Sequence, residues 1–488
     1  MQNMNCNFKG VYVTNIVWLR DDLRLQDNPA LQSACDRGET IAIYIKEPND
    51  TKTEARDWWL HHSLNKLQTA LKNVGVPLVF AEGNACNILP QFIEEQNASA
   101  IFWNRRYTEK GIKTDGEIKT KYKDSKVLCQ SCMGNLLFEP WEIKNKQGGF
   151  FKVFTPMFKE LLTLKTPKPV PFTQPKEMRE RVQSTLTCTL EELNLINSNK
   201  IWHKSFEPHW EIGEAAAEIK LQKFLEEKIT HYKKGRDFMS DNSTSTLSPH
   251  LHFGEISPRT IFDEIEAFAL SNNLENHEGI QCFKSEIVWR EFSYQQLFHY
   301  EQIEQKPINE KFKGFPWELD AEKFTAWKKG LTGIPIVDAG MRELWQTGIM
   351  HNRVRMIVAS LLTKNLLIPW QEGAKWFMDT LVDADEAANS ANWQWVAGCG
   401  LDASPYFRIF NPVTQGEKFD TDGTYVKKWV PELQDLDKKY IHQPWEASEF
   451  DLKLAGVELG KNYPKPIINL KASRERALEA YAFVKNQA

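Results

Sequence analysis

The feature that most constrains the fold is a change of pattern between residues 133 and 205. Before it, short apolar runs alternate with amphipathic segments, and after it helical periodicity dominates. A chain of 488 residues also exceeds what one hydrophobic core usually supports, about 250–300 residues. We therefore predict two domains of different class, an α/β domain followed by an all-α domain.

The predicted α/β domain spans residues 1–132. Its apolar runs predict five strands, at 15–19, 40–46, 77–80, 100–103 and 126–129. The amphipathic segments between them predict helices at 55–73, 85–96 and 110–123. This alternation is typical of a doubly wound parallel sheet. No GxGxxG motif follows the first strand, so a dinucleotide fingerprint is absent.

Residues 133–205 are predicted to be an interdomain linker. They contain Gly148-Gly149 and the proline-rich stretch TPKPVPFTQP, which is typical of a loop that crosses a protein surface. Residues 206–488 form the predicted helical domain.

Charge and cysteine usage indicate the compartment. A net charge of −4 argues against a uniformly basic nucleic-acid binder, although a local basic face is compatible with it. The cysteines are scattered, and only Cys129 and Cys132 form a CxxC pair, so we expect a reducing compartment and no zinc. The N-terminus has no signal pattern, and no apolar run approaches roughly 18 residues. We expect a cytoplasmic monomer that is independent of membranes.

The densest group of polar and aromatic side chains lies between Met350 and Trp395. Helical spacing in its first part predicts that Asn352 and Met356 share one face while Arg355 looks elsewhere. Its second part contains Asp383, Asp385, Asn389 and Trp393. Such a mixture suits a large flat ligand with polar edges, for example an isoalloxazine ring. Each residue alone would fit a surface helix followed by an aromatic core loop.

Two shorter motifs allow both a structural and a functional interpretation. The loop STSTLSP, residues 243–249, could hold phosphate through hydroxyls, amides and a helix start, but alone it fits a capping loop better. In EIVWREF, residues 286–292, Glu286, Trp289 and Arg290 share a helical face. That face could bind and stack on an extruded base, and an amphipathic helix with a salt bridge is about equally compatible. The HxH pair of His250 and His252 lacks a further ligand at metal spacing.

Seven motifs in order resemble the DNA photolyase/cryptochrome family: VWLRDDLRLQDNPAL, LSPHLHFGEISPR, WREF, GIPIVDAGMREL, MHNRVRM, NWQW and PYFRIFNPVTQGEKFD. The resemblance runs from about residue 15 to at least residue 433. It implies an antenna-binding α/β domain and a helical domain that holds FAD in a folded-back shape. It also implies light-dependent repair of cyclobutane pyrimidine dimers in UV-damaged, double-stranded DNA by a deoxyribodipyrimidine photo-lyase.

The resemblance implies roles for individual residues. FAD would be held by Tyr232, Thr244, Ser245, Thr246, Leu247, Ser248, Arg355, Asp383, Asp385 and Asn389. The flipped dimer and its flanking backbone would be bound by Arg236, Glu286, Trp289, Arg290, Asn352, Arg353, Met356, Trp395, Arg408 and Gln415. Glu286 would also act on the splitting dimer, and Asn389 would face the reactive nitrogen of the flavin. Trp393, Trp370 and Trp317 would carry electrons to the flavin, although core packing explains the same tryptophans.

Four features indicate the branch within the family. Asn389 resembles photolyases, because plant cryptochromes carry an acid there. Met356 resembles dimer photolyases, because six-four photolyases carry His. Trp395 resembles double-strand photolyases, because the single-strand branch usually has Tyr. No long low-complexity tail follows Leu433. The motifs RDWWLHHSL, residues 56–64, and LSPHLHFGE resemble the class III branch.

The antenna and two other functions remain open. Familiar folate binders have an Asn-Glu pair where this chain has Lys110-Gly111, so a different site for methenyltetrahydrofolate ranks first. Trp103, Asn104 and Arg105 end a predicted strand, where ligands often bind. A blue-light-sensing cryptochrome would bind flavin without repairing dimers. A plain nucleotide-binding module fused to helices would bind no flavin.

Overall fold

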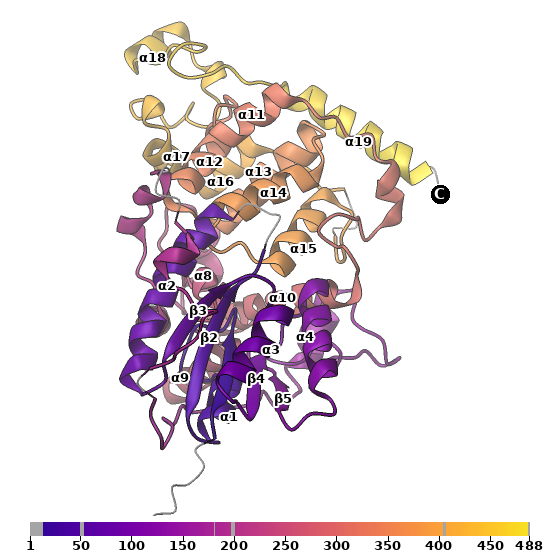
Figure 1. The fold of residues 1–488 in the computed structure, drawn as a ribbon. Coiled ribbons are helices and arrows are strands. Elements are labelled where there is room, and N and C mark those ends of the chain that lie inside the picture. Colours follow the sequence, from indigo (N-terminus) through magenta and orange to yellow (C-terminus); the bar gives the residue numbers. More distant parts are fainter. Residues whose placement is uncertain (1–12, 49–52, 180, 197–200, 404–406, 487–488) are drawn as a thin grey trace, which may run out of the picture.

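The structure, a computed structural model, describes residues 13–48, 53–179, 181–196, 201–403 and 407–486. The N-terminal segment for which no signal pattern is predicted falls almost wholly in residues 1–12, outside the described residues. A sheet flanked by helices forms one end of the molecule, and helices alone form the other (Figure 1). No helix in the described ranges is long and apolar enough to span a bilayer.

The sheet consists of five parallel strands in the order β3-β2-β1-β4-β5. The strands are β1 (Asn15–Leu19), β2 (Thr40–Lys46), β3 (Leu78–Glu82), β4 (Ala100–Asn104) and β5 (Leu128–Cys132). The central strand β1 pairs Asn15 with Thr40 on one side and with Ala100 on the other. The predicted doubly wound sheet is confirmed, and only β3 and β5 have a bound that is displaced by two residues or more from the prediction.

Helices cover both faces of the sheet. They are α1 (Pro29–Cys35), α2 (Glu54–Asn73), α3 (Ala85–Glu95) and α4 (Glu109–Tyr122). Val17 and Leu19 pack with α1 and α2, whereas Ile16 and Trp18 pack with α3 and α4. Because both faces are buried, the strands are nearly continuous hydrophobic runs rather than alternating ones.

The chain that follows the linker is helical. Its main helices are α6 (Glu214–Glu227), α7 (Tyr232–Gly235), α8 (Ser248–His252), α9 (Pro258–Asn272), α10 (Glu278–His299), α11 (Ala321–Lys329), α12 (Pro335–Thr347), α13 (Asn352–Ser360), α14 (Trp370–Thr380), α15 (Glu386–Ala397), α16 (Pro412–Phe419), α17 (Thr424–Trp429), α18 (Glu449–Leu454) and α19 (Leu470–Asn486). Of these helices, α8, α9 and α10 lie beside the sheet (Figure 1). The helical pattern that starts at Met350 becomes a helix only at Asn352. His351 is the reason, because its side chain caps α13 by accepting from the Arg353 N–H.

The first part of the linker runs along α10. Arg290 donates to the carbonyl of Asn135 at 2.7 Å, and Glu291 accepts from the Leu137 N–H at 3.0 Å. One turn later, Gln295 donates to the Ile143 carbonyl at 3.0 Å. The linker then enters α5 (Phe154–Leu161). Side-chain partners on α10 therefore satisfy backbone groups of a segment that has little regular structure of its own.

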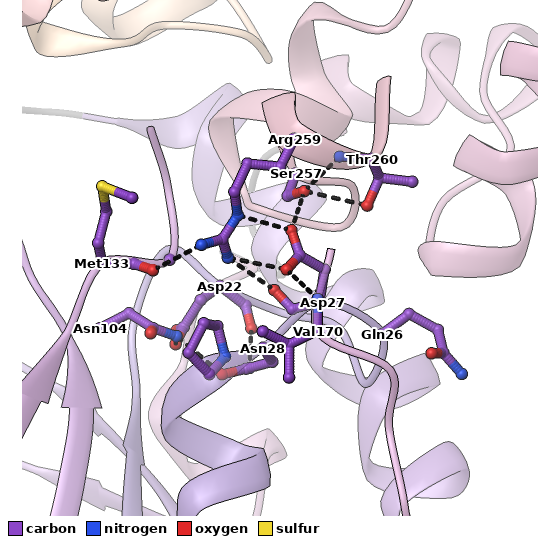
Figure 2. Close-up of polar contacts among 12 residues, drawn as sticks. Asp22, Gln26, Asp27, Asn28, Asn104, Met133, Val170, Ser257, Arg259 and Thr260 are labelled. Carbon is purple, nitrogen blue, oxygen red and sulfur yellow. Dashed lines mark hydrogen bonds and ion pairs between the residues drawn. The ribbon is translucent and has the colours of Figure 1, made fainter. Parts of the chain in front are cut away.

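A buried ion pair joins the α/β part of the chain to α9 of the helical part (Figure 2). Arg259, at the start of α9, contacts both carboxylate oxygens of Asp27, at 2.8 and 3.0 Å. Asp27 is 1% exposed and Arg259 is 4% exposed. The same carboxylate accepts from Ser257 and, at 2.8 Å, from the Val170 N–H, while Arg259 also donates to the Met133 carbonyl. One pair thus fixes the loop after β1, the linker at Met133 and at Val170, and α9.

Gly254 makes a second close contact between the same parts. Its φ of +64° lies in the left-handed region, and a Cβ there would lie 2.1 Å from the Asp21 carbonyl oxygen. Arg24 donates to the Gly254 carbonyl at 2.9 Å. Only glycine allows this turn to meet the loop after β1 so closely.

Removing one partner of the Asp27 pair should destabilise the protein strongly. Arg259→Ala leaves a buried carboxylate without its cation, which typically costs about 3–5 kcal/mol. Urea unfolding followed by circular dichroism measures this loss. Lys168→Ala, which breaks the exposed pair with Asp263, is the control and should leave the unfolding midpoint nearly unchanged. Equal effects of the two substitutions would contradict the role of the Asp27 pair.

Candidate functional site

A cavity of about 390 Å³ lies within the helical part, with walls from α10, α13 and α15. Many of the residues singled out from the sequence line it: Arg236, Glu286, Trp289, Arg290, Asn352, Arg355, Met356, Asp383, Asp385, Asn389, Trp393 and Trp395. These positions are far apart in the chain, and the packing of three helices brings them to one place.

The other candidate residues lie outside this wall: Tyr232, Thr244, Ser245, Thr246, Leu247, Ser248, Arg353, Arg408, Gln415, Trp370 and Trp317. Two of these residues, Ser248 and Tyr232, contact side chains of the cavity wall. The hydroxyl of Ser248 donates to Asp383 at 2.6 Å, and the ring of Tyr232 lies 5.3 Å from the guanidinium of Arg236. The loop that ends at Ser248 is therefore adjacent to the cavity.

Asp383 is held from two sides. Arg355 donates to both of its carboxylate oxygens, at 2.8 and 3.0 Å, and the third donor is Ser248. The expectation that Arg355 faces away from Asn352 and Met356 is wrong, since all three line the cavity. The reason is that residues three apart on a helix also share a face, and the long guanidinium reaches Asp383.

Asp385 caps α15 and carries further partners. One carboxylate oxygen accepts from the Ala388 N–H at 2.8 Å, and the other accepts from the Tyr294 hydroxyl at 2.6 Å. Nδ1 of His252 lies 3.6 Å from that second oxygen. Burial alone would raise the pKa of Asp385, but His252 and Arg290 hold the pKa well below its usual range. The cavity therefore contains a fixed negative charge.

The short helix α8 holds both acids. Ser248 and His252 stand four residues apart, so they lie on one face of α8. Ser248 meets Asp383 and His252 faces Asp385, two residues further along the chain. In the described part of the chain, no group of His, Cys, Asp or Glu has the arrangement of a metal site.

The mouth of the cavity has one aromatic side and one charged side. Trp289 stacks on Phe154 with ring centroids 3.7 Å apart and an angle of 5°, so one face of its indole is covered. Glu286 forms a short ion pair with Arg236. Burial opposes the charge of Arg236, but the hydrogen bond to Glu286 and the other neighbouring groups together outweigh it and raise the Arg236 pKa. Trp395 donates to the Asp402 carbonyl at 3.0 Å.

The remaining basic and amide candidates differ in their partners. Arg353 pairs with Asp237 at 2.5 Å and lies over the ring of Phe419. Arg408 is exposed, with its guanidinium 4.7 Å from the ring centroid of Phe410. The buried side-chain oxygen of Gln415 has no hydrogen-bond partner among the described residues.

The three candidate tryptophans belong to one core. Trp393 and Trp370 are 3% and 1% exposed, whereas Trp317 is half-buried at the edge of that core. The Glu318 N–H donates to the Leu367 carbonyl at 2.7 Å, which places the Trp317 segment beside the chain that leads into Trp370.

Sequence reasoning missed several neighbours of these groups. Tyr294 binds Asp385, and its position eight residues after Glu286 and four after Arg290 was the signal that could have found it. His252 was considered only as a metal ligand. Trp327, whose ring centroid is 6.3 Å from that of Trp393, gave no signal because it fits the apolar face of α11.

The crevice at the carboxyl ends of β1 and β4 is filled by the protein itself. Asn104 donates to Asp22 at 2.6 Å and to Asn28 at 2.8 Å, and Gly134 packs directly on its side chain. Trp103 is fully buried, and Arg105 pairs with Glu139. The residues considered for ligand binding at this strand end are thus engaged in internal contacts.

A parallel α/β part joined to a helical part with an acidic, tryptophan-lined cavity is the architecture of light-driven flavoproteins. Residues 15–176 match the family model described as DNA photolyase, and residues 283–483 match the FAD binding domain of DNA photolyase. The chain belongs to the DNA photolyase/cryptochrome family, and its cofactor is FAD.

Individual relatives agree with this assignment. The deoxyribodipyrimidine photo-lyase of Agrobacterium fabrum is 48% identical over 472 residues, which cover 96% of this chain and 98% of that protein. Cryptochrome-2 of Arabidopsis thaliana is 36% identical, over 95% of this chain and 78% of its own length. A crystal structure of a bacterial class III photolyase from Agrobacterium tumefaciens superposes with a TM-score of 0.94 at 47% identity, covering 99% and 100% of the two chains.

Gly373 on α14 should be required for the position of Trp393. A Cβ there would lie 2.1 Å from Cη2 of the indole. Gly373→Ala should therefore destabilise the protein by about 1–3 kcal/mol, as overpacked cores do, and should change the tryptophan fluorescence. Gly116→Ala is the matched control, because a Cβ at that position on α4 meets nothing within 4 Å. It should be neutral or stabilise by about 0.5–1 kcal/mol. Unchanged stability of Gly373→Ala would disprove the tight contact.

Proposed function

We propose that this protein is a deoxyribodipyrimidine photo-lyase, which binds UV-damaged DNA and uses blue light to split cyclobutane pyrimidine dimers. One observation carries the proposal. A single cavity unites the Arg355–Asp383 pair and Asp385 with Glu286, Trp289 and other groups suited to a pair of extruded bases. The 48% identity with a deoxyribodipyrimidine photo-lyase across nearly the whole chain supports it.

The residues present fit FAD. A cavity of about 390 Å³ lies in the usual size range of ligand pockets, about 300–1,000 Å³, and it combines apolar walls with a few fixed polar groups. Arg355, Asp383, Asp385 and Asn389 would face the polar edges of the ring system. Tyr232 and the loop from Thr244 to Ser248, including Ser245, Thr246 and Leu247, would hold the phosphates and ribose. When bound, FAD supplies the light-excited electron donor.

Arg355 would set the charge of this part of the cavity. Its guanidinium is fixed by Asp383 and by the Met350 carbonyl, at 2.7 Å, so it cannot turn away. A fixed positive charge beside the ring would favour an anionic reduced cofactor. Asn389 donates one N–H to the Ala374 carbonyl at 3.1 Å, which leaves its side-chain oxygen and its second N–H as the groups that can face the ring.

The dimer would enter between aromatic side chains. Because Phe154 covers one face of Trp289, only the opposite face can receive a base, and Trp395 would close the other side. Glu286 and Asn352 would bond the base edges, with Met356 and Arg290 beside them. A DNA phosphate would compete with Glu286 for Arg236, so binding of the backbone would free the Glu286 carboxylate for the dimer. Arg353, Arg408 and Gln415 would hold the flanking backbone.

We further propose that Trp393, Trp370 and Trp317 carry electrons from the surface to the flavin. Trp393 lines the cavity, and Trp317 is the member that reaches solvent. We propose the division into an antenna domain, residues 1–132, a linker, 133–205, and a catalytic domain, 206–488, in a cytoplasmic monomer. A folate antenna would bind away from the strand end at Asn104, because that crevice is filled.

A blue-light receptor of the cryptochrome type is the alternative. Its support is the 36% identity with Cryptochrome-2. Asn389, Met356 and Trp395, each the residue expected of a dimer photolyase, favour repair instead. Only repair predicts that the purified protein splits dimers.

The test is dimer splitting in irradiated thymine oligomers under blue light, with chemically reduced protein. We expect wild type to restore the thymines. Glu286→Gln should weaken binding of dimer-containing DNA about tenfold, because a hydrogen bond accepted by a charged carboxylate contributes about 1.5 kcal/mol or more. Glu301→Gln, at an exposed acid just beyond α10, should behave as wild type. A reduced wild-type protein that leaves the dimers intact would refute the repair function and favour the receptor.

Trp370→Phe should separate photoreduction from repair. Phenylalanine is much harder to oxidise than indole, so the variant should photoreduce oxidised FAD several times more slowly. Repair by chemically reduced variant should match wild type, because that electron already resides on the cofactor. Absorbance under blue light measures the first property and the oligomer assay the second. Trp141→Phe, an exposed tryptophan of the linker, is the control. Loss of both properties in Trp370→Phe would contradict an electron-carrying role.

A further inference from the structure

Arg56, at the first turn of α2, reaches the cavity through one histidine. Its Nε donates to Nε2 of His252 at 3.1 Å, and Nδ1 of the same ring lies 3.6 Å from Asp385. We propose that Arg56 and His252 form a relay that fixes the charge and orientation of Asp385. Arg56 is then a positioning residue of the flavin site that the α/β part supplies. This inference rests on the proposed contact between FAD and Asp385.

The relay determines where the imidazole carries its proton. An arginine side chain only donates hydrogen bonds, so Nε2 of His252 must accept. A neutral ring has one N–H, which is then at Nδ1, on the side of Asp385. At 3.6 Å this contact is longer than a normal hydrogen bond. The Nδ1–H group therefore attracts the carboxylate electrostatically but does not take up one of its acceptor positions. Asp385 keeps acceptor capacity for a ligand in addition to its bonds from Tyr294 and Ala388.

A protonated His252 would act differently. A full imidazolium would pair with Asp385 and draw the carboxylate away from a ligand. The charged groups that face the ring are Arg56 from α2, Asp385 before α15 and Asp21 after β1. Burial first, and then the positive charge of Arg56, lower the pKa of His252, whereas the two carboxylates raise it. Burial and Arg56 together favour the neutral ring.

Two consecutive contacts, from α2 to Glu255 and from Glu255 to His250, position α2 beside the HxH pair. Trp59 stands three residues after Arg56, on the same face of the helix, and donates to Glu255 at 3.1 Å. Glu255 in turn lies 2.5 Å from Nδ1 of His250. Both histidines of the HxH pair are therefore tied to the RDWWLHHSL segment, one directly and one through Glu255. This accounts for two motifs that repair chemistry leaves unexplained.

The decisive variant is Arg56→Gln. Without the guanidinium, the His252 pKa should rise, and acidification should protonate the ring. The dissociation constant of oxidised FAD should then increase about tenfold between about pH 8 and pH 6, whereas that of wild type should change less than about twofold. The fluorescence of FAD that is released when the holoprotein is diluted measures the dissociation constant of the variant and that of wild type. Lys72→Gln is the control, because it removes the same charge from an exposed site in the last turn of α2.

Two further measurements keep the test decisive. The double variant Arg56→Gln/His252→Gln has no ring to titrate and should lose the pH dependence. In wild-type holoprotein labelled with ¹⁵N-histidine, the signal that disappears in His252→Gln should show the Nδ1–H tautomer, even if Arg56→Gln fails to fold. An Nε2–H tautomer, an imidazolium near neutral pH, or a pH-independent Arg56→Gln variant would overturn the relay. Failure of the repair function would show separately, as absent dimer splitting by wild type.

Discussion

The buried pair of Asp27 and Arg259 is the constraint on which the rest of the structure depends. Taking two charges out of water is expensive, and the cost is offset only where further hydrogen bonds satisfy both groups. Here Ser257, the Val170 N–H and the Met133 carbonyl complete the set. Asp27 even adopts a φ of +49°, which Asp tolerates better than most residues. The pair therefore fixes how the sheet meets the helices.

The contact between the sheet and the helical part changes what can bind at the carboxyl ends of the strands. In doubly wound folds, ligands usually bind beyond the carboxyl ends of the strands, where the strand order reverses. In this chain, the corresponding groups contact protein: Asp21 binds Arg106 at 2.6 and 2.8 Å, and Arg24 binds the Gly254 carbonyl. The edge of the sheet has become an interface with the helical part. Its polar groups are satisfied by contacts with other protein groups.

The sequence predicts the sheet well because burial on both faces leaves long apolar runs. It misses α1, because seven residues contain too few turns for a helical period. Motif resemblance selects most of the residues that line the cavity, but it says nothing of how they pair. The Glu286–Arg236 pair and the backing of Trp289 by Phe154 depend on tertiary packing. Helical spacing from Glu286 and Arg290 could have identified Tyr294. Arg56 and His252 lie 196 positions apart, so no local pattern connects them.

The cavity gathers three charge centres whose partners come from different parts of the chain. Asp383 pairs with Arg355 of α13, Asp385 faces the neutral His252, and Glu286 pairs with Arg236. Of the three carboxylates, Asp385 is the one without an arginine of the described residues at hydrogen-bond distance, and its bonds come from the Tyr294 hydroxyl and the Ala388 N–H. A carboxylate in that state is a strong acceptor for a ring N–H. Keeping it so requires a nearby group that attracts it without neutralising it, and a histidine whose other nitrogen is occupied by arginine meets that requirement.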